Sequence, residues 1–125
     1  QADGADETIA RNAIVAYLEA LNREDLQAAL RLVHPASPVR EPTEKTLARM
    51  FQTYDLFHEL EKLRVVERST DEMYVWTVHT IRKLSGPELS DMRTESVHTL
   101  RRLSNGQWKI YSTISGYTEI LSVPR

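Results

Sequence analysis

The sequence predicts an α+β fold in which helices come first and an antiparallel sheet of about four strands follows. Two observations predict it. In the first half of the chain, apolar residues recur every three or four positions, the period of an amphipathic helix. In the second half the period changes to two, and β-branched and aromatic residues become common, as in half-buried strands. Helices followed by antiparallel strands favour helices packed on one face of a sheet.

Three helices are expected in the first half. The first spans about residues 7–21, and its apolar side chains fall on one stripe: Ala10, Ile14, Tyr17, Leu18 and Leu21. Asp25 is a good N-cap for a second helix, which Pro35 stops because proline lacks the N–H that a helix interior needs. Thr43 is expected to cap a third helix that ends near residues 55–57.

Four strands are expected in the second half. Their predicted ranges are 58–68, 73–84, 92–103 and 107–120. The short polar segments 69–71 and 104–106 have the composition of tight turns, so each is expected to close an antiparallel hairpin. Both faces of the second strand carry bulky side chains, so its inward face stays open from sequence.

The second of these turns sets the register of the last hairpin. A three-residue loop pairs Leu100 with Ile110 and Arg101 with Lys109. A two-residue loop would instead align Arg101 with Ile110 and place an arginine among apolar partners. We therefore expect the three-residue loop, with Gly106 in the left-handed conformation.

The length of the chain indicates how many domains it forms, and its charge and apolar runs indicate which partners are not expected. A chain of 125 residues and 14.4 kDa has the usual size of one domain, so a single domain is expected over 1–125, with 1–6 disordered. The 16 basic and 18 acidic residues are interspersed and sum to a net charge of -2, which provides no field for nucleic acid. Apolar runs are only a few residues long, so a membrane is not an expected partner either.

The cysteine count leaves the compartment open. No cysteine is present, which excludes disulfides and thiolate chemistry but suits oxidising and reducing compartments alike. The polar start at Gln1 without a methionine is compatible with cleavage after a signal peptide and equally with a trimmed chain. Export and a cytoplasmic location are therefore equally compatible with the sequence.

Three segments in order carry a resemblance to a known superfamily. They are Leu-Asn-Arg-Glu-Asp at 21–25, the break Val-His-Pro at 33–35, and the closing hairpin Gly-Gln-Trp-Lys-Ile at 106–110. Together they resemble the nuclear transport factor 2-like superfamily, which includes SnoaL-like and ketosteroid isomerase-like proteins. The resemblance implies a cystatin-like cone, in which a strongly curved sheet wraps around a long helix. It does not by itself imply an activity, because the superfamily holds enzymes, interaction domains and proteins of no known activity.

In the enzymes of this superfamily, chemistry is done inside the cone by acidic or histidine side chains. With the three-residue loop, His98 faces Ser112 and Ser96 faces Ile114. The resemblance places this face in the cone, so His98 is the best candidate for a catalytic residue or for a polar group in a pocket. The carboxylates nearest the cone are Glu95, expected on the outer face, and Glu41, expected in the loop before the third helix. Neither resembles the aspartate pair of an isomerase.

The rest of the candidate pocket is aromatic. We expect a ligand-binding set that joins an apolar lining to two polar groups: Tyr54, Trp76, His98, Trp108 and Ser112. Tyr17 and Phe51 are further aromatic candidates, although aromatic side chains at such spacings are more often plain core. The four histidines lack the close spacings of a metal site, so neither a metal nor a cofactor is expected.

The outer face of the sheet is expected to carry semi-apolar side chains, namely Val97, Thr99, Tyr111 and Thr113. Such a face usually finds a partner, and the resemblance implies a homodimer formed through it. The leading hypothesis is a cone-shaped domain, non-enzymatic or of unknown activity, that dimerises through its sheet and can hold a small apolar ligand in the cone. The alternatives are an isomerase, dehydratase or cyclase that uses a cavity histidine, and an adaptor or exported domain that binds a protein.

Overall fold

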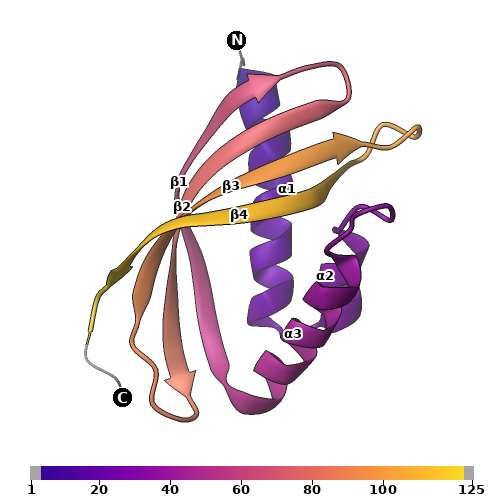
Figure 1. Ribbon diagram of the computed structural model, residues 1–125. Helices are drawn as coiled ribbons and strands as arrows, with labels where there is room; N and C mark the ends of the chain where they lie inside the picture. The colour runs from indigo at the N-terminus through magenta and orange to yellow at the C-terminus, as the bar shows by residue number, and fades with distance from the viewer. Residues whose placement is uncertain (1–3, 123–125) are drawn as a thin grey trace.

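The computed structural model describes residues 4–122. Helices occupy the first half and a sheet the second, so the predicted α+β fold is confirmed (Figure 1). The elements are α1 (Gly4–Asn22), α2 (Leu26–Arg31), α3 (Arg40–Thr53), β1 (Asp55–Arg68), β2 (Glu72–Ser85), β3 (Met92–Arg102) and β4 (Trp108–Ile120). The sheet bends around α1, while α2 and α3 lie beside the lower part of that helix (Figure 1).

Helix α1 supplies one wall of the core. Its predicted apolar stripe is buried apart from Tyr17, which is partly exposed, and Ala20 joins it. The helix begins at Gly4, so residues 4–6, expected to be disordered, form its first turn, and residues 1–3 lie outside the described residues. The carboxyl groups of Asp6 and Glu7 in this turn suit the positive end of the helix dipole. Within residues 4–122, no helix combines the length and the apolar character needed to cross a membrane.

The second helix starts as predicted, and the third does not. The Asp25 side chain accepts a hydrogen bond of 3.0 Å from the backbone N–H of Ala28, which caps α2. Helix α3 begins at Arg40, three residues before the expected cap at Thr43. Proline is tolerated in a first turn because its missing N–H would be unpaired there, so Pro42 lies inside the helix.

The four strands form an antiparallel meander in the order β1-β2-β3-β4. The three-residue loop is confirmed: Gly106 has φ +89°, Leu100 pairs with Ile110, and Arg101 pairs with Lys109. The pairing of β1 with β2 contains three register shifts and that of β4 with β3 contains two, whereas β2 and β3 pair without interruption. Bulges bend a strand and increase its twist, which accounts for the curvature that closes the sheet around α1.

The inward face of β2 is settled by burial. Met73, Val75 and Thr77 are almost fully buried, whereas Tyr74 is exposed and Trp76 partly so. Over this part of β2 the odd-numbered side chains therefore point at α1, and Tyr74 and Trp76 lie on the convex face. Met73 and Val75 pack with Leu100 and Ile110 from the next strands, and this group closes the core against the helix.

Candidate functional site: a cavity inside the cone

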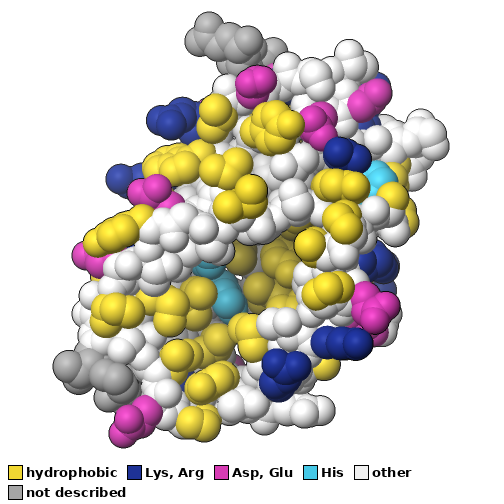
Figure 2. Space-filling model, viewed as in Figure 1, with side chains coloured by type: hydrophobic (Ala, Val, Ile, Leu, Met, Phe, Trp, Pro, Cys, Tyr) yellow, Lys and Arg dark blue, Asp and Glu magenta, His cyan; other side chains and the backbone are white. Residues whose placement is uncertain are grey.

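A cavity of about 380 Å³ lies between α1 and the concave face of the sheet. Figure 2 shows it as a hollow near the middle of one face, with histidine side chains at depth and hydrophobic side chains around them. This volume falls in the range of small-molecule sites, which starts at about 300 Å³. It equals the liquid volume of about a dozen water molecules.

The two walls of the cavity differ in chemistry. The helix wall is apolar except for one phenol and consists of Ile14, Tyr17, Leu18 and Leu21. The sheet wall is rich in hydroxyl and imidazole groups, from His58, Thr77, His79, Ser96, His98, Ser112, Thr113 and Ser115. Val33, Val39 and Ile110 add apolar surface beside Thr43. The cavity is therefore amphipathic, with one apolar side and one polar side.

His98 lies on the polar wall, and a threonine hydroxyl contacts each of its ring nitrogens. Its Nε2 is 3.0 Å from Thr77 Oγ1, and its Nδ1 is 2.8 Å from Thr113 Oγ1. A neutral imidazole has one N–H donor and one acceptor nitrogen, so one threonine donates to the ring and the other accepts from it. Burial lowers the pKa of His98 to about 4, and the neighbouring His79 lowers it further in the same direction. The ring is therefore neutral near pH 7.

The pairing of His98 corrects the expected register. His98 lies opposite Thr113, and Ser96 lies opposite Ser115, each one residue beyond the predicted partners Ser112 and Ile114. The reason is the register shift between Thr99 and Leu100, where β4 contains one extra residue. The bulge brings Ser112 and Thr113 together on the cavity wall.

The same shift changes the convex face. Thr113, expected on the outer face, lies at the cavity, and Ile114, expected on the inner face, is 72% exposed. Val97 is exposed on the convex face as expected. A one-residue slip moves every following side chain to the other face, so a single bulge accounts for both differences.

His58 and His79 form a second polar group on this wall. Their rings stack with centroids 6.2 Å apart and planes at 25°. Burial lowers the pKa of His58 to about 4, with a further lowering from His79, and burial also lowers the pKa of His79 against an opposing effect of Glu61. The buried Nδ1 of His58 has no hydrogen-bond partner among the described residues.

The end of α1 fixes the backbone of His58. Asn22 Oδ1 accepts a hydrogen bond of 2.7 Å from the His58 N–H, and Asn22 Nδ2 donates one of 2.9 Å to the His58 carbonyl. One amide side chain thus satisfies both backbone groups of a residue on β1. The contact ties the last turn of α1 to the strand that carries the stacked histidine.

The helix wall contributes one polar group of its own. Tyr17 lines the cavity, and burial raises the pKa of its phenol to about 12. The phenol therefore keeps its proton near neutral pH and remains a hydrogen-bond donor there.

Two of the five predicted site residues line the cavity and three do not. His98 and Ser112 are on its wall. Tyr54 caps the end of α3 and lines a separate surface groove. Trp76 lies under the guanidinium of Arg64 at 5.0 Å, and Trp108 packs against the core beside Arg68. These three aromatics are scaffold rather than cavity wall, because their strands or helix point them elsewhere.

The sequence analysis missed most of the polar wall. His58 was counted only among the four histidines, and the inward face of the strand that carries His79 stayed open. Thr113 was expected on the outer face, and Thr77 and Ser115 were not considered. The signal available was the alternation of Val75, Thr77 and His79 on β2, but it required knowing which face of that strand points inward. The bulge in β4 had no such signal.

Neither of the carboxylates weighed as catalytic candidates lies at the cavity. Glu41 pairs with Lys45 on the exposed side of α3, at 3.3 Å, and Glu95 is on the convex face as expected. Among the residues of 4–122 that line the cavity, none is an aspartate, glutamate, lysine or arginine. In the same described part of the chain, no group of three or more histidine or carboxylate side chains is arranged to hold a metal ion.

Comparison with known proteins identifies one family. The model of the family described as "Anti-sigma-I factor RsgI9, C-terminal domain" matches residues 12–121. A curated relative, the anti-sigma-I factor RsgI9 of Acetivibrio thermocellus, is 35% identical over 71 residues, which are 57% of this chain and 10% of that protein. The chain therefore spans about a tenth of the length of the curated relative it matches.

Solved structures share the fold at low sequence identity. A protein of Novosphingobium aromaticivorans, provisionally described as an aromatic ring hydroxylase, has a TM-score of 0.78 at 14% identity and covers 100% of this chain and 95% of its own. A ketosteroid isomerase-like protein of Erwinia carotovora atroseptica has a TM-score of 0.67 at 20% identity, covering 90% and 96%. A protein of Streptomyces avermitilis, provisionally described as a dehydratase of the NTF2-like family, has a TM-score of 0.72 at 20% identity. The match covers 95% of this chain and 98% of that protein.

These structures confirm the fold that the resemblance implies. One of them is described as a member of the NTF2-like family, and a further neighbour, from Nostoc punctiforme, as having a cystatin-like fold. At such identities the likeness establishes the fold alone, because one fold carries many unrelated functions.

Proposed function

This chain belongs to the family of the C-terminal domain of the anti-sigma-I factor RsgI9, and we propose that it is a small-molecule-binding module without catalytic activity. The observation that carries the proposal is the amphipathic cavity of about 380 Å³ inside the cone. A cavity with an apolar wall facing a wall of hydroxyl and imidazole groups is the usual construction of a ligand site. The family's name supports a role within a regulatory protein.

The geometry favours binding over catalysis. Both ring nitrogens of His98 are engaged by threonine hydroxyls, at 3.0 and 2.8 Å, so neither is free to take a proton from a substrate. A base whose pKa is lowered to about 4 is also far from the value that serves proton transfer near pH 7. No carboxylate lines the cavity within the described residues. The other titratable groups on its wall are His58 and His79, whose pKa values burial also lowers, and Tyr17, whose pKa burial raises to about 12.

Ligand binding can be tested by filling the cavity. Ser112→Phe adds a phenyl ring at the cavity wall, and Ser104→Phe makes the same change in the exposed turn before β4. We expect at least one of indole, benzoate and benzylamine to shift the amide NMR signals of cavity residues such as Ser96 and Ser115. Ser112→Phe should abolish these shifts and Ser104→Phe should keep them. Shifts that persist in Ser112→Phe, or that occur only outside the cavity, would contradict the proposal.

A second role, self-association through the convex face, is favoured by a different observation. Register places Trp76, Val97 and Ile114 in one row across β2, β3 and β4. Val97 is 39% and Ile114 72% exposed. Exposed apolar rows of this kind mark interaction surfaces.

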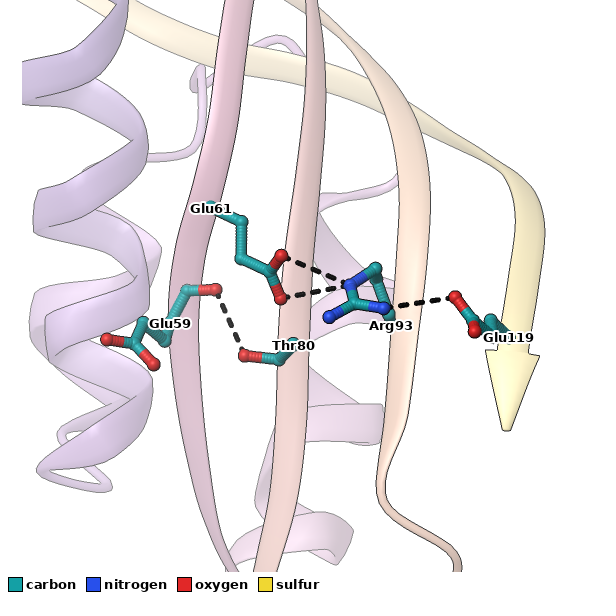
Figure 3. Close-up of polar contacts among 5 residues, drawn as sticks. All are labelled: Glu59, Glu61, Thr80, Arg93 and Glu119. Atoms are coloured by element: carbon teal, nitrogen blue, oxygen red, sulfur yellow. Dashed lines mark hydrogen bonds and ion pairs between the residues drawn. The ribbon is translucent and has the colours of Figure 1, made fainter. Parts of the chain in front are cut away.

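The charges beside this row suit a second copy of the chain. Arg93 reaches across β2 to both carboxylate oxygens of Glu61, at 3.1 Å, and also binds Glu119 at 3.1 Å (Figure 3). Thr80 lies on β2, the strand between those of Glu61 and Arg93, and its hydroxyl approaches the Glu59 carbonyl at 3.5 Å (Figure 3). The surface thus carries both signs of charge, so a two-fold related copy is not repelled.

Sedimentation of the purified protein tests self-association. We expect a dimer that Ile114→Glu converts to a monomer, because two carboxylates would be buried in a two-fold contact. Val66→Glu is the matched control, since Val66 is also exposed, at 54%, but lies on β1 outside the row. A monomeric wild-type protein would refute this role and leave the cavity proposal untouched.

A further inference from the structure

The charge character of the cavity indicates what class of ligand it accepts. Of the residues that line it within 4–122, none carries a full charge near neutral pH: the side chains are aliphatic, hydroxyl, phenol or imidazole. An ion moved from water into the buried part of such a site loses hydration without gaining a counter-charge. Thr113 and Ser115 at the edge of the wall are exposed, but the interior of the cavity is unfavourable for both anions and cations.

The histidines do not change this conclusion. An anion could in principle be compensated by protonating one of them, but burial holds the pKa of both His58 and His98 near 4. Protonating either ring at pH 7 would offset much of the gain from the ion pair. His58 and His79 also stack, so a charge on one ring would lie beside the other.

The polar wall offers hydrogen bonds of adaptable direction. Thr77, His98 and Thr113 form a chain through the two ring nitrogens of His98. If the His98 Nδ1–H donates to Thr113, the threonine hydroxyl keeps its own proton to donate; if Thr113 donates to Nδ1, its lone pairs stay open to accept. A change of tautomer at His98 therefore switches what Thr113 presents to the cavity.

The bulge in β4 places several hydroxyl groups of this strand on the cavity wall. It brings Ser112 beside Thr113 on the wall, and Ser115 follows on the same strand. These hydroxyls face Leu18 and Leu21 of α1 across the cavity, because they belong to opposite walls. A molecule with one polar edge and one apolar face matches both walls at once.

We propose that the cavity selects uncharged ligands that place a hydroxyl or carbonyl group against Thr113 and an apolar ring or chain against α1. The inference rests on the proposed binding function, which it narrows to a chemical class. Hydroxyl groups hydrogen-bond without the desolvation cost of an ion, so discrimination by charge is expected even among ligands of the same shape.

A set of three isosteric probes tests the charge selection. Benzyl alcohol, benzoate and benzylamine share one ring and differ at pH 7 in being neutral, anionic and cationic. Titrations followed by amide and threonine methyl NMR give each dissociation constant. A probe of about eight non-hydrogen atoms is expected to bind with a Kd on the order of 1 mM. We expect benzyl alcohol to bind at least about tenfold more tightly than either ion.

Two matched variants test the hydrogen bond between Thr113 and the hydroxyl group of the ligand. Thr113→Val keeps the shape of the side chain and removes its hydroxyl, and Thr99→Val makes the same change at a neighbouring position on β3 that does not line the cavity. Thr113→Val should weaken benzyl alcohol about fivefold or more and change the tautomer signals of His98 in 15N spectra. Thr99→Val should do neither.

The possible results separate the inference from the function on which it rests. Binding of benzoate or benzylamine in the cavity as tightly as benzyl alcohol would overturn the charge selection while supporting a binding cavity. Equal affinity of Thr113→Val and wild type for benzyl alcohol would overturn the role of Thr113. Saturating amounts of all three probes without any shift at the cavity residues would overturn both the inference and the proposed function.

Discussion

The rings of His58 and His79 stack across β1 and β2, with centroids 6.2 Å apart and planes at 25°. Both face the inside of the cone, and the pKa of each is lowered chiefly by burial. Folding therefore disfavours protonation of both imidazoles relative to the unfolded chain. Acid stability and the hydrogen-bond arrangement around the cavity follow from this difference.

Acid should destabilise the protein through His58. Its pKa is about 4 in the folded state against 6.5 as a reference, so between these values the unfolded chain binds more protons. The free energy of unfolding then falls as pH is lowered through this window. Between pH 7 and pH 5 this one histidine is expected to cost about 2 kcal/mol. His58→Phe should reduce the loss by that amount in urea unfolding, and an unchanged pH dependence in the variant would refute the assignment.

The Asn22 side chain should contribute more to stability than a surface asparagine does. Asn22→Ala leaves the N–H and the carbonyl of His58 without their partners, at 2.7 and 2.9 Å, and is expected to lower the free energy of unfolding by about 2 to 3 kcal/mol. Asn12→Ala on the exposed side of α1 is the control and should change it by less than about 0.5 kcal/mol. Equal effects of the two substitutions in urea unfolding would show that the contact adds no stability.

Gly86 should not tolerate a side chain. It has φ +121°, and a Cβ there would lie 2.8 Å from the Thr53 carbonyl oxygen and 2.9 Å from a ring carbon of Tyr54. Gly86→Ala combines backbone strain with a steric clash and is expected to cost about 2 to 4 kcal/mol.

Gly106→Ala separates the two effects. Its φ of +89° is also strained for alanine, but no atom lies within 4 Å of the added Cβ, so a loss of only about 1 kcal/mol is expected. The free energies of unfolding of both variants, measured in urea, check the order. A larger loss for Gly106→Ala would refute the clash at Gly86.

Thr77 should control the tautomer of His98. Thr77→Val retains the shape of this almost fully buried side chain but leaves His98 Nε2 without its partner at 3.0 Å. We expect a loss of about 1 to 3 kcal/mol in stability and a change in the 15N shifts of the His98 ring. Thr99→Val, which leaves the hydrogen bonds of His98 intact, should leave those shifts unchanged. Identical ring shifts in wild type and Thr77→Val would mean that Thr113 alone sets the tautomer.

Local signals in the sequence predicted the elements but not their outer limits. Asp25 capped α2 as expected, because a capping aspartate acts through its own next turn. Thr43 did not cap α3, since a proline in the first turn is compatible with a helix that begins earlier, at Arg40. Where a helix begins depends on a few hydrogen bonds in its first turn. One sequence is therefore compatible with several neighbouring first residues.

The site was only partly predictable for a related reason. His98 and Ser112 were found from the turn at 104–106, which carries a local signal in Gly106. Their pairing was missed because the bulge near Tyr111 depends on how β4 bends across β3, and no residue type announces it.

By itself the sequence determined the order of helices and strands, the apolar stripe of α1 and the length of the last turn, because each depends on residues close together in the chain. Only the tertiary structure decided that His58, His79 and His98 meet on one wall, that Trp76 faces outward, and that Thr113 faces inward. Those facts depend on which face of each strand meets α1, and that choice is made by packing between segments far apart in sequence.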